Sequence, residues 1–249
     1  MKNIDTRNIK RHGISLFSLF TLSFLLLTAC DDNTKVKIVY DHQERYSVGD
    51  ATIEQPVSKI NIDWYEGMVS IRYSDSNVFR IREDSDSVLT DSLRMRYCVS
   101  DDGVLDINFC QSGTYRHGQL LLINKRLWIE VPHDAKLDDI EIDMVGGLIC
   151  YDSVWCRDLT LDVVNVATTM WTPTLPDEID VDAVKATLRL YVPTTSGMTI
   201  EMDGIKTSID SELPVRKDGK NTTIIGDGRC KIDMDAVSSS IYINELKNE

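Results

Sequence analysis

The chain has 249 residues, enough for one domain of up to about two hundred residues plus additional segments. Acidic residues outnumber basic ones, 40 against 27, and the formal net charge is −13. A surface of this charge repels phosphate backbones, so the composition argues against nucleic acid as a partner.

The first 29 residues have the pattern of a secretory signal peptide. Four basic residues precede an uncharged run over residues 14–29. That run is shorter than the roughly 20 residues of a membrane-spanning helix, and it fits the basic and apolar regions of a signal peptide. It ends in Leu27-Thr28-Ala29-Cys30, which resembles the lipobox of bacterial lipoproteins. In that family the signal peptidase cleaves before the cysteine, so the resemblance implies a signal peptide over residues 1–29 and lipidation of Cys30.

Residues 30–55 are expected to be the lipidated cysteine and a tether with some strand content. Without the first 29 residues the chain carries 23 basic and 39 acidic residues, a net charge of −16. Asp31 and Asp32 directly follow the cysteine. An aspartate there retains some Gram-negative lipoproteins at the inner membrane, whereas in others an acidic start resembles a surface-export tag. The sequence leaves the choice of membrane and leaflet open.

From residue 56 onward the chain repeats one pattern. Each copy has apolar residues at offsets 0, 2, 4 and 5, usually another at offset 9, and an aspartate at offset 3. The six copies begin at Ile60, Ile140, Leu159, Ile179, Ile200 and Ile232. Alternation at offsets 0, 2 and 4 is a strand period, and recurrence about every 20 residues is typical of a solenoid. We therefore expect the five apolar side chains to be buried and neighbouring coils to complete each other's core.

Two segments interrupt the repeats. In the first, about 78–126, two alternating stretches flank Asp101-Asp102-Gly103, which predicts a β-hairpin. The second, about 211–229, is polar and rich in turn residues. The sequence thus predicts an all-β, single-domain β-solenoid or β-roll of about 20-residue coils over residues 56–249, with a hairpin insertion, after an N-terminal lipoprotein signal peptide.

The ordered set of segments resembles a bacterial putative-adhesin family, a domain of unknown function with repeated Ile-x-Ile-x-Thr-Val-Ser-Gly units. Residues 182–186, 203–207 and 235–239 occupy the positions of the unit. Lys125 to Pro132 and Gly226-Asp227-Gly228 match the family's flanking segments. No unit here keeps an intact Thr-Val-Ser-Gly. The resemblance implies a stacked β-solenoid or β-roll, often on a lipid anchor, and brings no established catalytic residue.

The sharpest candidate site is a column of acids at offset 3. Its members are Asp63, Asp143, Asp162, Asp182, Asp203 and Asp235. Because offsets 2 and 4 point inward, offset 3 points outward, and stacking in register would place neighbouring aspartates about 4.8 Å apart. One interpretation is binding of Ca²⁺, which takes carboxylate oxygens. We favour the other, a solvated face, because Ca²⁺ needs about 6–8 oxygen ligands and one column supplies few.

The cysteines form a second candidate feature. Five remain after Cys30, at positions 98, 110, 150, 156 and 230. Export permits disulfides, and closeness in sequence makes Cys150 and Cys156 the most plausible pair, although a buried free thiol is an alternative for any of them. No spacing fits a zinc site, and there is neither a nucleophile elbow nor a phosphate loop. We therefore predict no catalytic residue.

These observations predict a non-enzymatic cell-envelope lipoprotein that displays a β-solenoid for adhesion, ligand binding or scaffolding. Its expected partners are the membrane, through the lipid anchor, and an envelope protein or glycan; apart from the Ca²⁺ interpretation, no cofactor is expected. It would lie at the outer membrane, in the periplasm or at the cell surface.

Two alternatives stay open. A polysaccharide-active β-helix enzyme would need a groove with several carboxylates and an exposed aromatic. The tryptophans could supply a sugar-stacking platform, although filling of core and corners is their commoner role. They are Trp64, Trp128, Trp155 and Trp171. The other alternative is an envelope stress or sensing partner that acts through the polar loops 111–119 and 211–229.

Overall fold

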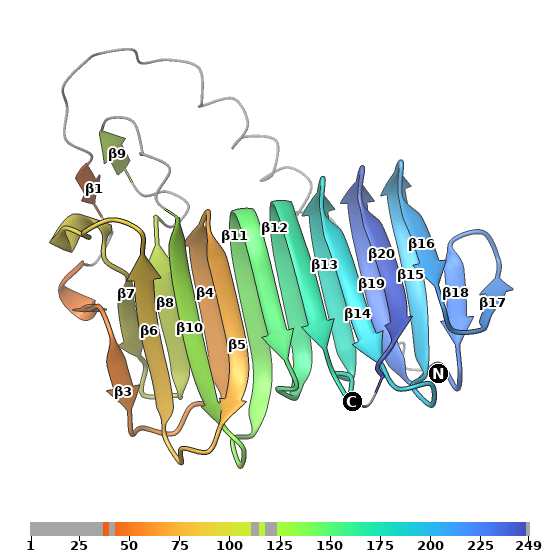
Figure 1. The fold of residues 1–249 in the computed structure, drawn as a ribbon, viewed down its shortest axis with the longest axis horizontal. Coiled ribbons are helices and arrows are strands. Elements are labelled where there is room, and N and C mark those ends of the chain that lie inside the picture. The colour runs from red at the N-terminus through yellow and green to blue at the C-terminus, as the bar shows by residue number, and fades with distance from the viewer. Residues whose placement is uncertain (1–36, 40–42, 111–114, 118–123, 248–249) are drawn as a thin grey trace, which may run out of the picture.

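The computed structural model describes residues 37–39, 43–110, 115–117 and 124–247, which are almost entirely β (Figure 1). The predicted signal peptide and Cys30 lie outside the described residues. Within them there is no α-helix, only the 3₁₀ turns η1 (Gln43–Arg45) and η2 (Asp91–Leu93). No helix of membrane-spanning length and hydrophobicity occurs in this part of the chain.

Twenty strands are described. They are β1 (Lys37–Val39), β2 (Ser47–Val48), β3 (Ala51–Ile53), β4 (Lys59–Tyr65), β5 (Met68–Ser74), β6 (Phe79–Ser85), β7 (Arg96–Val99), β8 (Val104–Phe109), β9 (Tyr115–His117), β10 (Lys125–Pro132), β11 (Leu137–Asp152), β12 (Cys156–Trp171), β13 (Glu178–Val184), β14 (Thr187–Val192), β15 (Met198–Ile205), β16 (Ser208–Ser211), β17 (Val215–Asp218), β18 (Thr222–Ile225), β19 (Cys230–Val237) and β20 (Ser240–Glu245).

Eighteen of these strands form one open sheet that is bent into two layers. The long strands β11 and β12 run through the bend, so that each contributes to both layers. The first layer has the order β8-β4-β11-β12-β13-β19-β15, and all of its pairs are parallel. The second has the order β3-β6-β10-β5-β11-β12-β14-β20-β16, and only the β3–β6 and β6–β10 pairs are antiparallel.

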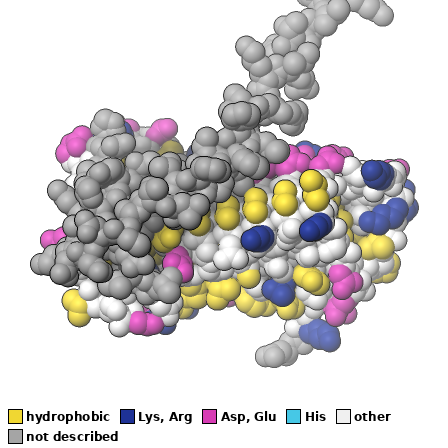
Figure 2. Space-filling model, turned by 90° about the horizontal axis from the view of Figure 1, so that it is seen from above, with side chains coloured by type: hydrophobic (Ala, Val, Ile, Leu, Met, Phe, Trp, Pro, Cys, Tyr) yellow, Lys and Arg dark blue, Asp and Glu magenta, His cyan; other side chains and the backbone are white. Residues whose placement is uncertain are grey.

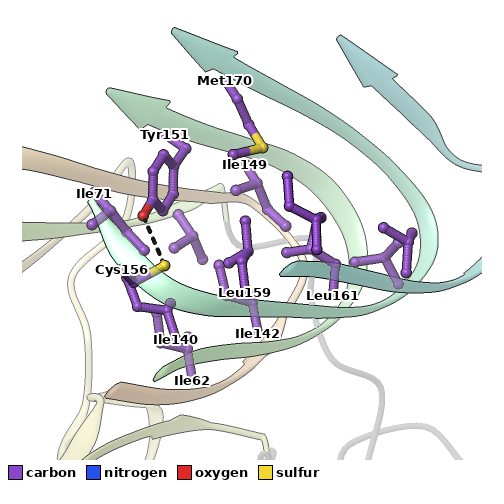
Figure 3. Packing of buried hydrophobic residues seen from close by; sticks show 14 of the residues in the cluster. Ile62, Ile71, Ile140, Ile142, Ile149, Tyr151, Cys156, Leu159, Leu161 and Met170 are labelled. Atoms are coloured by element: carbon purple, nitrogen blue, oxygen red, sulfur yellow. Dashed lines mark hydrogen bonds between the residues drawn. The ribbon is translucent and has the colours of Figure 1, made fainter. Parts of the chain in front are cut away.

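The core lies between the two layers (Figure 3). Side chains alternate along each strand, and the inward set is almost wholly apolar. Ile140 and Ile142 in the first half of β11 face Ile149 and Tyr151 in its second half. The same alternation in each copy of the repeat extends this packing along the stack. The predicted strand period is therefore the pattern that holds the two layers together.

The bend is made at the same place in each copy. The residue at offset 6 has a positive φ in all six: Glu66 (59°), Gly146 (82°), Asn165 (58°), Lys185 (55°), Lys206 (59°) and Ser238 (55°). A non-glycine residue in this region costs about 1–3 kcal/mol. Hydrogen bonds to the adjacent copy offset this cost; the Lys185 N–H, for example, donates to the Val237 carbonyl over 2.8 Å. The backbone corner is therefore conserved without a Thr-Val-Ser-Gly sequence.

The order of the stack differs from the order of the chain. The last copy, β19 and β20, lies between the fourth copy, β13 and β14, and the fifth, β15 and β16. The polar segment 211–229 forms the hairpin β17–β18, whose strand β18 pairs antiparallel with β15. The hairpin covers the outer edge of the first half of β15. The chain then runs back, and β19 fills the position between β13 and β15.

The hairpin insertion extends the stack at its other end. Strands β7 and β8 form the predicted antiparallel hairpin, and β8 then pairs parallel with β4. In the predicted tether, β3 pairs with β6, and its residue Ile53 is buried. The folded unit therefore begins before residue 56, because Ala51 to Ile53 complete the edge of the second layer.

Candidate functional site

The six aspartates of the predicted column form one continuous row across the first layer. The register pairs are Asp63–Asp143, Asp143–Asp162, Asp162–Asp182, Asp182–Asp235 and Asp235–Asp203. Adjacent strands lie about 4.8 Å apart, a spacing at which like charges repel. The outward positions two residues earlier include Glu141, Asp180, Asp233 and Glu201, next to the uncharged Asn61 and Thr160, so acidic side chains predominate on the outer face of this layer. We call it the acidic face.

Charge repulsion and burial act most strongly in the middle of the row. Asp143 and Asp162 are half-buried. Burial, followed by the charge of Asp63, raises the pKa of Asp143 to about 6. Burial, followed by the charges of Asp143 and Asp182, raises the pKa of Asp162 to about 7. Near neutral pH the centre of the row therefore holds fewer negative charges than carboxyl groups.

The row is not arranged as a chelating cluster. Within the described ranges, no group of three or more His, Cys, Asp or Glu side chains is placed to hold a metal ion. At the end of the row the Asn221 amide donates a hydrogen bond to the Asp203 carboxylate, and one carboxylate oxygen is thereby occupied. A solvated face remains our prediction for the row, and binding of Ca²⁺ is the alternative to be tested in solution.

The apolar residues at offset 5 are not buried as expected. They point outward at the corner and form a second row beside the aspartates, which we call the corner row. Its members in stack order are Tyr65, Val145, Val164, Val184, Val237 and Ile205. Ile205 is 66% exposed. Figure 2 looks onto this edge and shows a line of hydrophobic side chains with acidic side chains beside it. The expectation failed because strand alternation continues through offset 5, and the chain turns only at offset 6.

The structure does not join Cys150 to Cys156. Both are free thiols, as are Cys98 and Cys230. Cys150 is half-buried on the outer side of β11, whereas Cys156 is buried and its Sγ lies 3.4 Å from the hydroxyl of Tyr151 (Figure 3). Burial raises the pKa of Cys156 to about 12. The predicted disulfide is therefore corrected: the two residues are near in sequence but lie on opposite faces of the sheet.

The four tryptophans do not form a single platform. Trp64 is buried against Phe109, and Trp155 lies in the turn between β11 and β12, where its backbone N–H donates to the Tyr73 hydroxyl. Trp128 and Trp171 instead lie on the outer face of the second layer. Trp171 is 38% exposed, and its ring stacks on that of Tyr191 with 5.8 Å between centroids and 11° between planes.

Trp171 belongs to a row that was not anticipated. One cross-strand line on the second layer joins residues of alternating charge to two aromatic rings. Its members in order are Arg80, Glu130, Arg72, Asp152, Trp171, Tyr191 and Asn244. We call this line the charged-aromatic row. Five of the six copies contribute one residue each at offset 12, and these residues differ in type, whereas Arg80 and Glu130 lie between the first two copies. No repeated motif therefore marked the row in the sequence.

The charged end of this row lines a shallow, open cleft. Arg72, Arg80, Glu130 and Asp152 all contribute, together with residues of the turns at the same end of the stack, including His133 and Ser153. The Arg72 Nη2 atom lies 2.7 Å from the Glu130 Oε1 atom. The Ser153 hydroxyl donates to Asp152 over 2.8 Å. His133 stacks on Tyr73 at 4.5 Å, which fixes one wall. The cleft is therefore polar and has side chains held in place.

A buried ion pair lies at the opposite end of the same strands. Lys125 is fully buried; its Nζ atom is 2.8 Å from the Glu83 carboxylate, donates to the Leu93 carbonyl, and lies 3.6 Å from the centroid of the Phe109 ring. Burial lowers the pKa of Lys125 to about 8. The Met95 N–H also donates to Glu83. This enclosed group joins β6, β8 and β10, and its position suits a structural role.

The comparisons with known proteins identify the fold. No family profile matches the chain, and no curated protein matches it. The crystal structure of a putative cell adhesion protein from Clostridium sporogenes is similar with a TM-score of 0.58 and 12% identity, over 80% of this chain and 99% of that one. A putative adhesin from Bacteroides fragilis matches over 80% and 97% of the two chains with 11% identity and a TM-score of 0.35. This chain therefore shares its fold with a bacterial protein described as a putative cell adhesion protein.

Proposed function

We propose that this protein is a non-enzymatic cell-envelope lipoprotein, anchored through Cys30, that displays a β-solenoid for adhesion or ligand binding. The observation that carries the proposal is the pair of broad outer faces whose side chains stand in register from strand to strand. Such faces present one side chain per strand at a spacing of about 4.8 Å, which suits a long partner better than a single small molecule.

The sequence and the fold support this proposal from different directions. The lipobox at residues 27–30 predicts an anchor at the start of the chain. The fold is shared with a protein described as a putative cell adhesion protein. The acidic face would disfavour anionic surfaces, so the partner is expected to meet the second layer.

One observation favours the enzyme alternative. The cleft combines the carboxylates Glu130 and Asp152 with an exposed aromatic on the next strand, Trp171. Hydrolysis of a glycoside requires one carboxyl group free to act as acid and another free to act as base or nucleophile. Arg72 contacts Glu130, and the Ser153 hydroxyl is hydrogen-bonded to Asp152. Both carboxylates are thus engaged, and we favour binding over turnover.

The test compares cells that express the full chain with cells that express a Cys30→Ser variant. Fractionation and labelling with a fatty-acid analogue measure anchoring, and attachment of the cells to immobilised mucin, extracellular matrix and other bacteria measures adhesion. The proposal requires that the wild type be labelled, fractionate with membranes and raise attachment. The variant should be unlabelled and should leave attachment at the level of cells without the protein. The proposal would be contradicted if cells with correctly anchored wild-type protein attached no better than cells without the protein.

A further inference from the structure

We infer that the cleft and the adjoining aromatic rings form a binding site for a neutral glycan, with Trp171 as its stacking wall. The inference rests on the proposed binding function and names the class of ligand. It depends on three features of the charged-aromatic row: the free face of one indole ring, the side chains next to it, and their balance of charge.

The orientation of Trp171 follows from its neighbours in the row. It stands between Asp152 on β11 and Tyr191 on β14. The Tyr191 ring covers one face of the indole in a nearly parallel stack, and Asp152, which lines the cleft, is the register neighbour on the opposite side of Trp171. As a residue, Trp171 is still 38% exposed. A flat apolar ring that is backed by a second ring and open on one side is suited to the C–H face of a pyranose, because both surfaces are flat and poorly hydrated.

The side chains beyond the indole suit the hydroxyl groups of the same sugar. Sugar hydroxyls both donate and accept, so they pair best with a mixture of carboxylates and guanidinium groups. Asp152 is the next residue in the row and offers acceptor oxygens, and Arg72 follows it with donors. The bond from Ser153 to Asp152 and the ion pair between Arg72 and Glu130 hold these groups before a ligand arrives. Such pre-organisation lowers the entropy cost of binding.

The charges favour a neutral glycan over an anionic one. Two arginines, Arg72 and Arg80, line the cleft together with three carboxylates, Asp75, Glu130 and Asp152. The chain as a whole carries a net charge of −13. A sialylated or sulfated sugar would therefore meet a repulsive field, whereas a neutral one would not. Since the row crosses several strands, an oligosaccharide can lie along it with successive units over successive strands.

The experiment measures binding of short neutral oligosaccharides of glucose, galactose, mannose and N-acetylglucosamine to the full chain in detergent. A sialylated and a sulfated oligosaccharide serve as comparison ligands, and calorimetric titration is the readout, because it does not depend on the tryptophan that the variants replace. We expect at least one neutral oligosaccharide to bind and to bind more tightly than either anionic one. Trp171→Ala should weaken binding at least about tenfold, Trp171→Phe less than that, and Asp152→Asn severalfold.

Tyr242→Ala is the matched control. Tyr242 is a similarly exposed aromatic on the same face, but it lies on β20, where Arg189 covers its ring at 5.4 Å, and it is outside the cleft. This variant should bind within about twofold of the wild type. All variants are compared only after equal melting temperatures have been measured. If Trp171→Ala failed this criterion, Trp171→Phe and Asp152→Asn would decide the test.

The outcomes separate this inference from the proposed function. Absence of binding to any neutral oligosaccharide, tighter binding to the anionic ones, or equal affinities of wild type, Trp171→Phe and Asp152→Asn would overturn the glycan site. Attachment of cells could still be present, and adhesion would then use another surface. The converse outcome is also informative. If the variants weaken glycan binding but cells that express the wild type do not attach, the glycan site is supported and the proposed adhesion function is rejected. Release of shorter sugars during the titration would overturn simple binding in favour of hydrolysis.

Discussion

Replacement of Asp162 by asparagine should stabilise the protein at pH 8. Asp162 is half-buried between Asp143 and Asp182, and its pKa is raised from 3.8 to about 7. The folded state therefore retains a proton that the unfolded state loses between about pH 4 and pH 7, so the stabilising contribution of this group, fully present below pH 4, is lost as the pH rises through 7. Above pH 7 the group is ionised in both states, and the full free-energy cost of holding its charge in the folded protein then lowers the stability.

The size of the effect follows from the two pKa values. A shift from 3.8 to about 7 corresponds to about 4 kcal/mol at 1.36 kcal/mol per pH unit. Because the carboxyl group is partly exposed, solvent screens much of this, and about 2 kcal/mol is a reasonable expectation. Asparagine removes the charge and keeps a similar shape. Asp162→Asn should therefore raise the free energy of unfolding by about 2 kcal/mol at pH 8 and change it little at pH 4.

Urea denaturation at pH 4 and pH 8, followed by tryptophan fluorescence, measures both values. The chain is strongly acidic, so any lost negative charge reduces the overall repulsion. Asp218→Asn on the exposed hairpin strand β17 controls for this general effect. The reasoning is refuted if the two variants gain equally at pH 8, or if the gain from Asp162→Asn is as large at pH 4 as at pH 8.

Three further predictions concern the corner, the buried ion pair and the cation question. Gly147→Ala should destabilise the fold by at least about 1–3 kcal/mol, because φ is +113° and the added Cβ would lie 2.0 Å from the Gly67 carbonyl oxygen. The control is Gly219→Ala, at a positive φ but in open space, which should lower the free energy of unfolding by less in the same denaturation assay. Lys125→Met should cost about 3–5 kcal/mol because Glu83 stays buried without its cation, and adding Glu83→Gln should restore part of the loss; full additivity of the two changes would contradict the buried pair. The melting temperature in millimolar Ca²⁺ should equal that in a Na⁺ salt of matched ionic strength. A melting temperature that rises only with Ca²⁺ would instead establish a cation site on the acidic face.

The repeat made the acidic row predictable from the sequence. Six copies with an aspartate at offset 3 can stack only in register if their apolar residues are to share one core. The left-handed residue at offset 6 was not predicted, because it is a glycine only in the copy that contains Gly146. In three of the other five, Glu66, Lys185 and Ser238, the backbone N–H donates to a carbonyl of the adjacent copy, and a single sequence does not show such bonds.

Two features lay beyond the sequence for a different reason. The copies that begin at Ile179, Ile200 and Ile232 share one pattern, so each would pack equally well beside either of the others. Their order depends on where the hairpin β17–β18 caps the stack, which is a property of the whole fold. The charged-aromatic row likewise joins one residue from each of seven strands. Residues such as Glu130 and Trp171 become neighbours in one row only once the stacking order is known.

The most direct test of the account is a pair of cysteine cross-links that read the stacking order. Asp182 and Asp235 are register partners on adjacent strands, whereas Asp182 and Asp203 are separated by the strand between them. A disulfide needs Cα atoms about 4.4–6.8 Å apart, which adjacent strands provide and strands two positions apart do not. With mild oxidation and peptide mass spectrometry, the double variant Asp182→Cys/Asp235→Cys should form the disulfide, and Asp182→Cys/Asp203→Cys should not. The reverse result would mean that the copies stack in chain order, and absence of both bonds would mean that they do not stack in register.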